Sequence, residues 1–110
     1  MRLLDSNIFI YAYRLQTTSL LSLLSDAASH ASEMTRLEVL GYHKFLPAEK
    51  LFLEQAFAKI TILDIDKAIV DKAIELRQQR KMSPGDAIHA ATALLNNLEL
   101  YTRNVSDLAG

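Results

Sequence analysis

Four polar residues, far apart in this 110-residue chain, are of the types that bind a hard divalent cation: Asp5, Glu38, Asp86 and Asn104. Clustered carboxylates repel one another, and a bound divalent cation commonly offsets this repulsion. Because all four side chains offer oxygen and the chain has no cysteine, they favour Mg²⁺ or Mn²⁺ over softer metals. Their residue types therefore predict a metal site, provided that the fold brings them together.

The segments around these residues predict such a fold. Asp5 ends the short apolar run "MRLLD", Glu38 lies in "TRLEVLGYHKFL", and Asp86 lies in "SPGDAIHAATAL". Thr102 ends the segment "LELYT", and Asn104 follows it. Short apolar strands that alternate with helices are typical of a parallel sheet covered on both faces. The carboxyl ends of the strands then share one edge, where ligands bind in such sheets.

The expected elements follow from hydrophobic periodicity and helix-start signals. Strands are predicted at residues 1–5, 30–34, 60–63 and 98–102, and helices at 7–14, 19–28, 35–46, 47–59 and 84–96. A further helix follows Asp64 as its cap, with an apolar stripe at Ile65, Ile69, Ala73 and Leu76. These elements predict an α/β fold, with a short central parallel sheet between two layers of helices.

Each acid also has a purely structural interpretation. Ser83, Pro84 and Asp86 form a capping box with proline at the first helical position, and Thr35 and Glu38 match a second capping box. Asp5 is equally suited to a turn before Ser6 as N-cap. The capping and metal-binding roles are compatible, because a helix N-terminus favours the ionised carboxylate that binds a metal.

The bulk composition narrows the function classes. The length suits a single domain spanning residues 1–110, and the net charge of −1 gives no global signal for nucleic-acid binding. The absence of cysteine excludes a disulfide scaffold and a thiol nucleophile. No signal peptide or apolar run of membrane-spanning length stands out, so we expect a cytoplasmic protein with no membrane partner.

Four segments, in order, resemble the motifs of the PIN-domain nuclease family. They are "LLDSNIFIYAY", "SEMTRLEVLGY", "SPGDAIHAATAL" and "LYTRNVSDL", and they span nearly the whole chain. The length and simplicity of the chain are most similar to the VapC-type toxins of bacterial toxin–antitoxin pairs. Each motif alone is weak, whereas four in register form a specific signal.

The resemblance implies a Mg²⁺-dependent (or Mn²⁺-dependent) endoribonuclease, the toxin of a type II pair, with an RNA substrate, a small antitoxin partner and a homodimeric state. The metal ligands and catalytic residues by this resemblance are Asp5, Glu38, Asp86 and Asn104, and the supporting residues are Asn7, Thr102 and Asp107. The ion would activate a water for in-line attack on phosphorus and offset charge on the developing oxyanion.

Two departures from the family keep other functions open. The chain stops three residues after Asp107, so we expect the family's final strand to be missing, and Asn104 removes one negative charge from the fourth corner. These features motivate an alternative, a catalytically inactive PIN-fold binding module. A second alternative is another metal-dependent phosphohydrolase with the same oxygen ligands.

Other residues have weaker signals. Arg36 and Arg103 flank motif acids and are candidates for RNA-phosphate contacts or for surface ion pairs. We interpret His89 as a packing residue beside the sheet rather than a catalytic one, and His30 and His43 as structural or surface residues. Gly85 leaves room near the expected metal edge. The apolar segments "IFIYAYRL" and "LLSLL" predict a contact with an antitoxin helix or a second copy.

Overall fold

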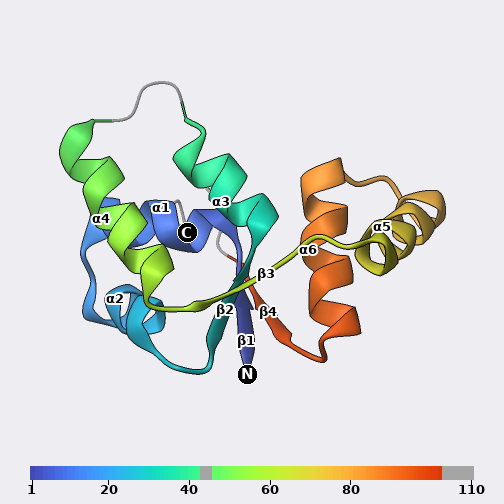
Figure 1. Cartoon of the computed structure of the whole chain (residues 1–110), viewed down its shortest axis with the longest axis horizontal. Helices are drawn as coiled ribbons and strands as arrows, with labels where there is room; N and C mark the ends of the chain where they lie inside the picture. The colour runs from blue at the N-terminus through green and yellow to red at the C-terminus, as the bar shows by residue number, and fades with distance from the viewer. Residues whose placement is uncertain (43–45, 103–110) are drawn as a thin grey trace.

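The structure, a computed structural model, describes residues 1–42 and 46–102. Within these residues, strands and helices alternate along the chain (Figure 1). Their bounds are β1 Arg2–Leu4, α1 Ser6–Leu15, α2 Thr18–Ser25, β2 Ser29–Ser32, α3 Glu33–Leu40, α4 Pro47–Ala58, β3 Thr61–Leu63, α5 Lys67–Gln79, α6 Pro84–Leu95 and β4 Glu99–Tyr101.

The strands form one parallel sheet in the order β3-β2-β1-β4. Strand β1 is central: Leu3 pairs with His30 of β2 on one side and with Leu100 of β4 on the other. Leu3 and Leu4 are fully buried, as expected for a central strand that is covered on both faces. The predicted parallel sheet is confirmed, and it places the residues that follow β1, β2 and β4 at one edge.

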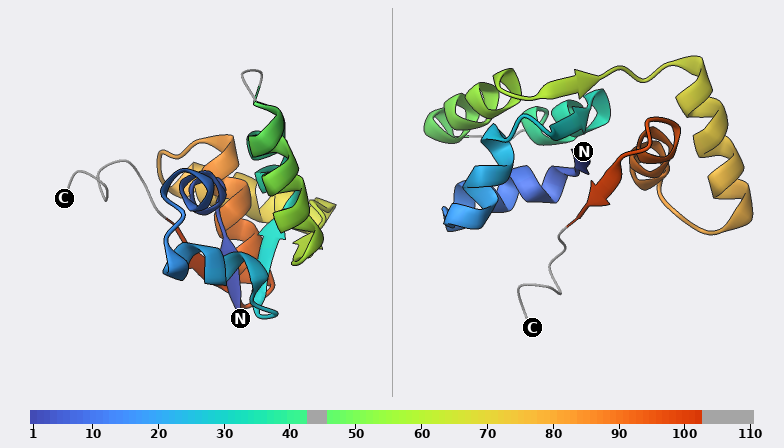
Figure 2. Two further views of the ribbon diagram at one scale, coloured as in Figure 1. Left: turned by 90° about the vertical axis from the view of Figure 1, so that its left-hand side faces the viewer. Right: turned by 90° about the horizontal axis from the view of Figure 1, so that it is seen from below.

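Helices cover both faces of the sheet. Helices α1 to α4 pack on one face around Phe9, Val39 and Leu53, and the ring of Phe9 stacks on Phe57 with centroids 4.4 Å apart. Helices α5 and α6 pack against each other on the other face around Ile69 and Ile88. Figure 2 shows the two helical layers on opposite sides of the strands. The three-layer α/β/α architecture is therefore as predicted.

The starts of α3 and α5 differ from the prediction. Helix α3 begins at Glu33 with Ser32 as its N-cap, whose hydroxyl accepts from the Met34 N–H at 3.0 Å. The predicted Thr35–Glu38 capping box is wrong, because strand β2 ends at Ser32 and a capping residue is already available there; Thr35 is fully buried inside the helix. Helix α5 is capped by Asp66 rather than Asp64, through the Ile69 N–H at 2.9 Å.

Apart from the end of α3, the remaining boundaries lie within three residues of the expected ones. The stripe on α5 is confirmed by the buried side chains of Ile69 and Ala73. The helix predicted at 35–46 ends at Leu40, with Gly41 as C-cap. The expectation of a missing final strand concerns residues 103–110, which lie outside the described residues. No helix within residues 1–42 and 46–102 has the length and apolar character needed to cross a membrane.

Candidate active site

Asp5 lies directly after the central strand. It is the N-cap of α1, and its Oδ1 accepts from the Ile8 N–H at 3.3 Å, so the capping role predicted for Ser6 belongs to Asp5. Its own N–H donates to the Tyr101 carbonyl at 3.1 Å, which places Asp5 beside the end of β4. Burial raises the pKa of Asp5, and the charge of nearby Asp86 adds to the increase.

Asp86 reaches the same place from α6. Ser83 is the N-cap of this helix, its Oγ accepts from the Asp86 N–H at 3.1 Å, and Pro84 occupies the first turn, all as predicted. The exposed Asp86 carboxylate is near enough to Asp5 to disfavour its ionisation. The two carboxylates therefore share one charged environment, although they are separated by most of the sequence.

A cleft of about 500 Å³ joins these two acids. It lies at the carboxyl edge of the sheet, between the start of α1, the end of β4 and the start of α6. Its polar lining comprises Asp5, Asn7, Arg80, Lys81, Asp86, His89 and Thr102. Two of the predicted supporting residues, Asn7 and Thr102, are thus brought beside Asp5 and Asp86.

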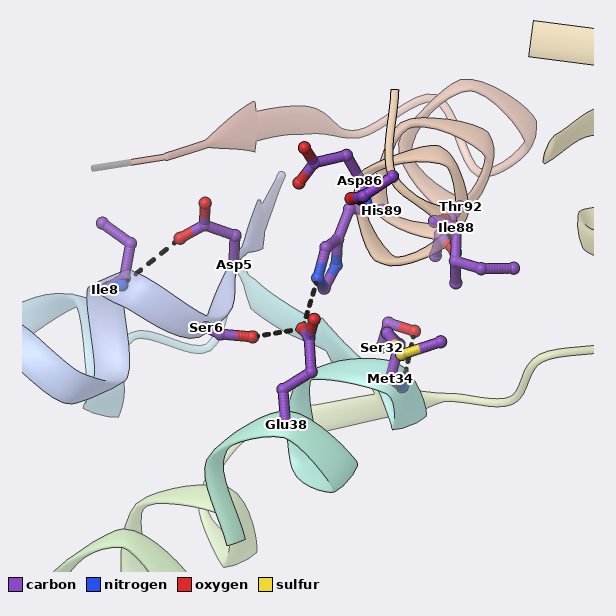
Figure 3. A network of polar contacts seen from close by, with 11 residues as sticks. Asp5, Ser6, Ile8, Ser32, Met34, Glu38, Asp86, Ile88, His89 and Thr92 are labelled. Carbon is purple, nitrogen blue, oxygen red and sulfur yellow. Dashed lines mark hydrogen bonds and ion pairs between the residues drawn. The ribbon is translucent and has the colours of Figure 1, made fainter. Parts of the chain in front are cut away.

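Glu38 occupies a different position from the one expected. It lies in the second half of α3 and caps no helix. Its Oε1 accepts two hydrogen bonds, from Ser6 Oγ at 2.5 Å and from His89 Nε2 at 2.9 Å. Figure 3 shows Glu38 reaching from α3 toward the ring of His89, with the Asp86 carboxylate beyond that ring and the Asp5 carboxylate to one side of it, near Ile8.

Gly85 provides the space that the Glu38 carboxylate needs. A Cβ placed on Gly85 would lie 2.7 Å from Glu38 Oε2, which is closer than real side chains approach. The glycine has no positive φ, so its contribution is steric and not conformational. The Glu38 carboxylate can therefore occupy its present position because residue 85 has no side chain.

The chemistry of the donor set fits a hard divalent cation. Asp5 and Asp86 offer carboxylate oxygens to one cleft, and Glu38 Oε2 has no hydrogen-bond partner among the described residues. Within residues 1–42 and 46–102, no three His, Asp or Glu side chains lie close enough together to hold an ion jointly. Asn104 and Asp107, predicted as fourth ligand and supporting residue, lie outside the described residues, as does Arg103.

The sequence missed the roles of Ser6 and His89. His89 does pack beside the sheet, with a side chain only 6% exposed, but it also contacts Glu38. The one sequence signal was its spacing of three residues from Asp86, which places both on one side of α6. For Ser6 no signal existed beyond its position next to Asp5.

Arg36 does not reach the cleft. Its guanidinium pairs with Glu33 at 2.7 Å, and it lines a separate hollow with Glu54 and Phe57. Its surface ion-pair interpretation is therefore the one that the structure supports. His30 is structural, with Nδ1 3.1 Å from the Ala28 carbonyl oxygen; His43 lies outside the described residues. Most of the apolar side chains of α1 and α2 are core residues, among them Phe9, Leu20 and Leu24.

The fold and the acidic cleft define an α/β protein whose polar residues gather at the carboxyl edge of a parallel sheet. Residues 2–106 match the sequence profile of the PIN domain. The chain belongs to the PIN-domain family.

Two solved structures illustrate this relationship. A chain of a toxin–antitoxin complex from Klebsiella pneumoniae is 32% identical; the match covers 100% of this chain and 92% of that chain, with a TM-score of 0.79. A chain of VapBC2 from Rickettsia felis, solved bound to a DNA fragment from their promoter, is 19% identical over 98% of this chain and 91% of that chain, with a TM-score of 0.78. The second likeness concerns the fold alone. No curated protein sequence matches the chain.

Proposed function

We propose that this protein is a divalent-metal-dependent endoribonuclease whose metal is bound by Asp5 and Asp86, with Glu38 contributing through a water molecule, because the three carboxylates do not lie close enough together to hold an ion jointly. The observation that carries the proposal is the convergence of Asp5 and Asp86 on one cleft, with Glu38 held beside it by two hydrogen bonds. The PIN-domain match supports a nuclease. Carboxylates so arranged repel one another unless a cation balances them.

The roles of the chain's own residues follow from their positions. Asp5, at the start of α1, and Asp86, at the start of α6, offer oxygens to the same cleft, and Ser6 and His89 orient Glu38. Asn7 and Thr102, which line the same cleft, orient the groups that occupy it; Asn104 and Asp107 have the fourth-ligand and supporting roles. The cation, Mg²⁺ or Mn²⁺, supplies Lewis-acid stabilisation of charge that develops on the phosphoryl oxygens.

The proposal extends to a partner. The Klebsiella pneumoniae structure, 32% identical, is of a toxin–antitoxin complex, which supports the toxin role and an antitoxin partner. A small antitoxin and a cytoplasmic location are part of the proposal. A groove of about 150 Å³ runs beside Glu38 and is lined by Ile10, Arg14, Tyr42 and Leu53. An apolar antitoxin segment in this groove would lie next to the proposed metal site. A homodimer remains part of the proposal.

The test is RNA cleavage by the purified protein with Mg²⁺ or Mn²⁺. Wild type, Asp5→Ala and Asp86→Asn are purified identically and incubated with several structured and unstructured RNAs, with EDTA as a control. We expect cleavage by wild type only, lost in EDTA and in both variants, because each variant removes a proposed ligand.

Two results contradict the proposal. Equal cleavage by all three proteins would mean that the activity belongs to a contaminant or to another site. Absence of cleavage by wild type on every RNA, together with retained Mn²⁺ binding, would favour the binding module that Asn104 first suggested. Growth arrest on expression, relieved by a co-expressed neighbouring small protein, tests the toxin role separately.

A further inference from the structure

We propose that Arg80 and Lys81 form the substrate-binding wall of the acidic cleft, where they bind RNA phosphates on either side of the bond that is cleaved. The proposal rests on the nuclease function above. It replaces Arg36, which the structure places elsewhere, as the source of phosphate contacts within the described residues.

The first argument is position. Arg80 and Lys81 lie in the connection between α5 and α6, and both line the cleft that contains Asp5 and Asp86. The connection is fixed by Arg77, whose Nε donates to the Met82 carbonyl at 3.1 Å. This bond closes the chain back on the last turns of α5, so the two cations are held at the cleft by a short, bonded segment.

The second argument is availability. The other basic side chains of α5 are engaged: Lys67 pairs with Asp71 at 2.8 Å and Lys72 with Glu75 at 3.2 Å. In the part of the chain that the structure describes, Arg80 and Lys81 have no side-chain hydrogen bond or ion pair, and both are exposed. Two unpaired cations beside an acidic cleft are free to bind an anionic ligand.

The third argument is electrostatic need. The net charge of −1 gives the protein no general attraction for RNA. The carboxylates that hold the metal would repel the incoming phosphates. Salt screens this repulsion only weakly, because the charges would lie closer together than the Debye length of about 10 Å. Cations on the same cleft offset that repulsion locally. An acidic protein segment is a poorer occupant, because it would have to approach Asp5 and Asp86 without delivering a phosphate to the metal.

The experiment compares Arg80→Gln/Lys81→Gln with Lys50→Gln/Lys59→Gln, which removes the same charge from two exposed lysines on and beside α4. Cleavage kinetics are measured on a short single-stranded RNA at several salt concentrations. We expect KM to rise about tenfold or more for the first variant, with kcat within about threefold, and little change for the control. The plot of log kcat/KM against log salt concentration should become less steep by about 1.4, because each of the two lost phosphate contacts contributes about 0.7 to its slope on single-stranded RNA. Arg80→Lys/Lys81→Arg, which keeps both charges, should restore most of the affinity.

The outcomes separate this proposal from the nuclease function. If wild type cleaves no RNA, the nuclease function fails, and RNA affinity measured by fluorescence anisotropy in EDTA decides the binding proposal alone. Equal RNA affinity and salt dependence for wild type and both charge-removing variants would overturn it. An unchanged KM with weaker inhibition by a co-purified antitoxin would also overturn it, and would assign the two cations to the protein partner. Unchanged Mn²⁺ affinity in the Arg80→Gln/Lys81→Gln protein is required for support, because a loss would place the effect at the metal.

Discussion

His89 Nε2 lies 2.9 Å from Glu38 Oε1 and joins two residues that are 51 positions apart in the chain. An ionised carboxylate only accepts hydrogen bonds, so Nε2 is the donor. Ser6 donates to the same oxygen from the start of α1. Two donors on Oε1 fix the carboxylate in one orientation and leave Oε2 for other contacts. Side chains of α1 and α6 thereby set the position of a proposed metal ligand on α3.

Replacing His89 should separate packing from this positioning role. His89→Leu fills similar volume without a donor, whereas His89→Gln keeps an N–H donor of comparable reach. We expect Mn²⁺ affinity to fall about 10-fold or more in the leucine variant, as for other residues that orient metal ligands, and to recover in the glutamine variant. Isothermal titration calorimetry measures both. Equal Mn²⁺ affinity in the two variants, with both proteins folded, would show that His89 only packs.

Gly85→Ala should affect stability and activity in opposite directions. Alanine favours a helix by about 1 kcal/mol over glycine, so unfolding in urea should occur at the same or a higher concentration. The added Cβ, however, would lie 2.7 Å from Glu38 Oε2 and displace this flexible carboxylate. We therefore expect RNA cleavage to drop about tenfold or more, since small errors in ligand position are costly. Wild-type activity in Gly85→Ala would contradict the steric argument.

Asp5→Asn should stabilise the metal-free protein at neutral pH. Burial raises the pKa of Asp5, so from the ordinary value of 3.8 up to the raised value the folded protein binds more protons than the unfolded chain. Stability therefore falls as the pH rises through that window and stays lower above it. Asparagine caps a helix as well as aspartate does, so the variant should have the higher Tm in EDTA at pH 7, with the difference vanishing below about pH 4.

Asp26→Asn provides the control with the opposite sign. The Ala28 N–H, and then Arg2, lower the pKa of Asp26, so its contribution is present above the ordinary value of 3.8 and is lost as the pH falls through the lowered value. Its replacement should reduce Tm at pH 7, by little because the group is exposed. If both variants shift Tm in the same direction at pH 7, the assignment for Asp5 is wrong.

The sequence predicted the layers of the fold better than the contacts within the site. Apolar strands and striped helices specify a covered parallel sheet because burial alone selects that arrangement, and Asp5 and Asp86 follow from strand and helix starts. The position of Glu38 did not follow, because Ser32 and Thr35 are both competent caps and only the end of β2 decides between them.

Polar contacts between residues far apart in the chain could not be predicted from sequence patterns. The bonds from Ser6 and His89 to Glu38 join residues 32 and 51 positions apart, and the carboxylate occupies space that a side chain at residue 85 would fill. Sequence patterns also could not decide between the two interpretations of Arg36. Arg36 flanks a motif acid in sequence but forms an ion pair with Glu33 one turn away, whereas Arg80 reaches the cleft from a connection with no recognisable motif.

The two functions of the α6 start, capping and metal binding, should separate in Asp86→Asn and Ser83→Ala. Ser83 Oγ provides the cap for the Asp86 N–H, so Ser83→Ala should lose about 1 kcal/mol of unfolding free energy and keep its rise in Tm with Mn²⁺. Asp86→Asn should unfold near the wild-type temperature in EDTA, because its side chain is exposed and asparagine suits a first turn, but should lose most of that rise. A ligand at about 100 times its Kd stabilises by about 2.7 kcal/mol, which differential scanning fluorimetry readily detects. If Asp86→Asn unfolds early in EDTA and still gains stability with Mn²⁺, then Asp86 serves the helix and not the metal.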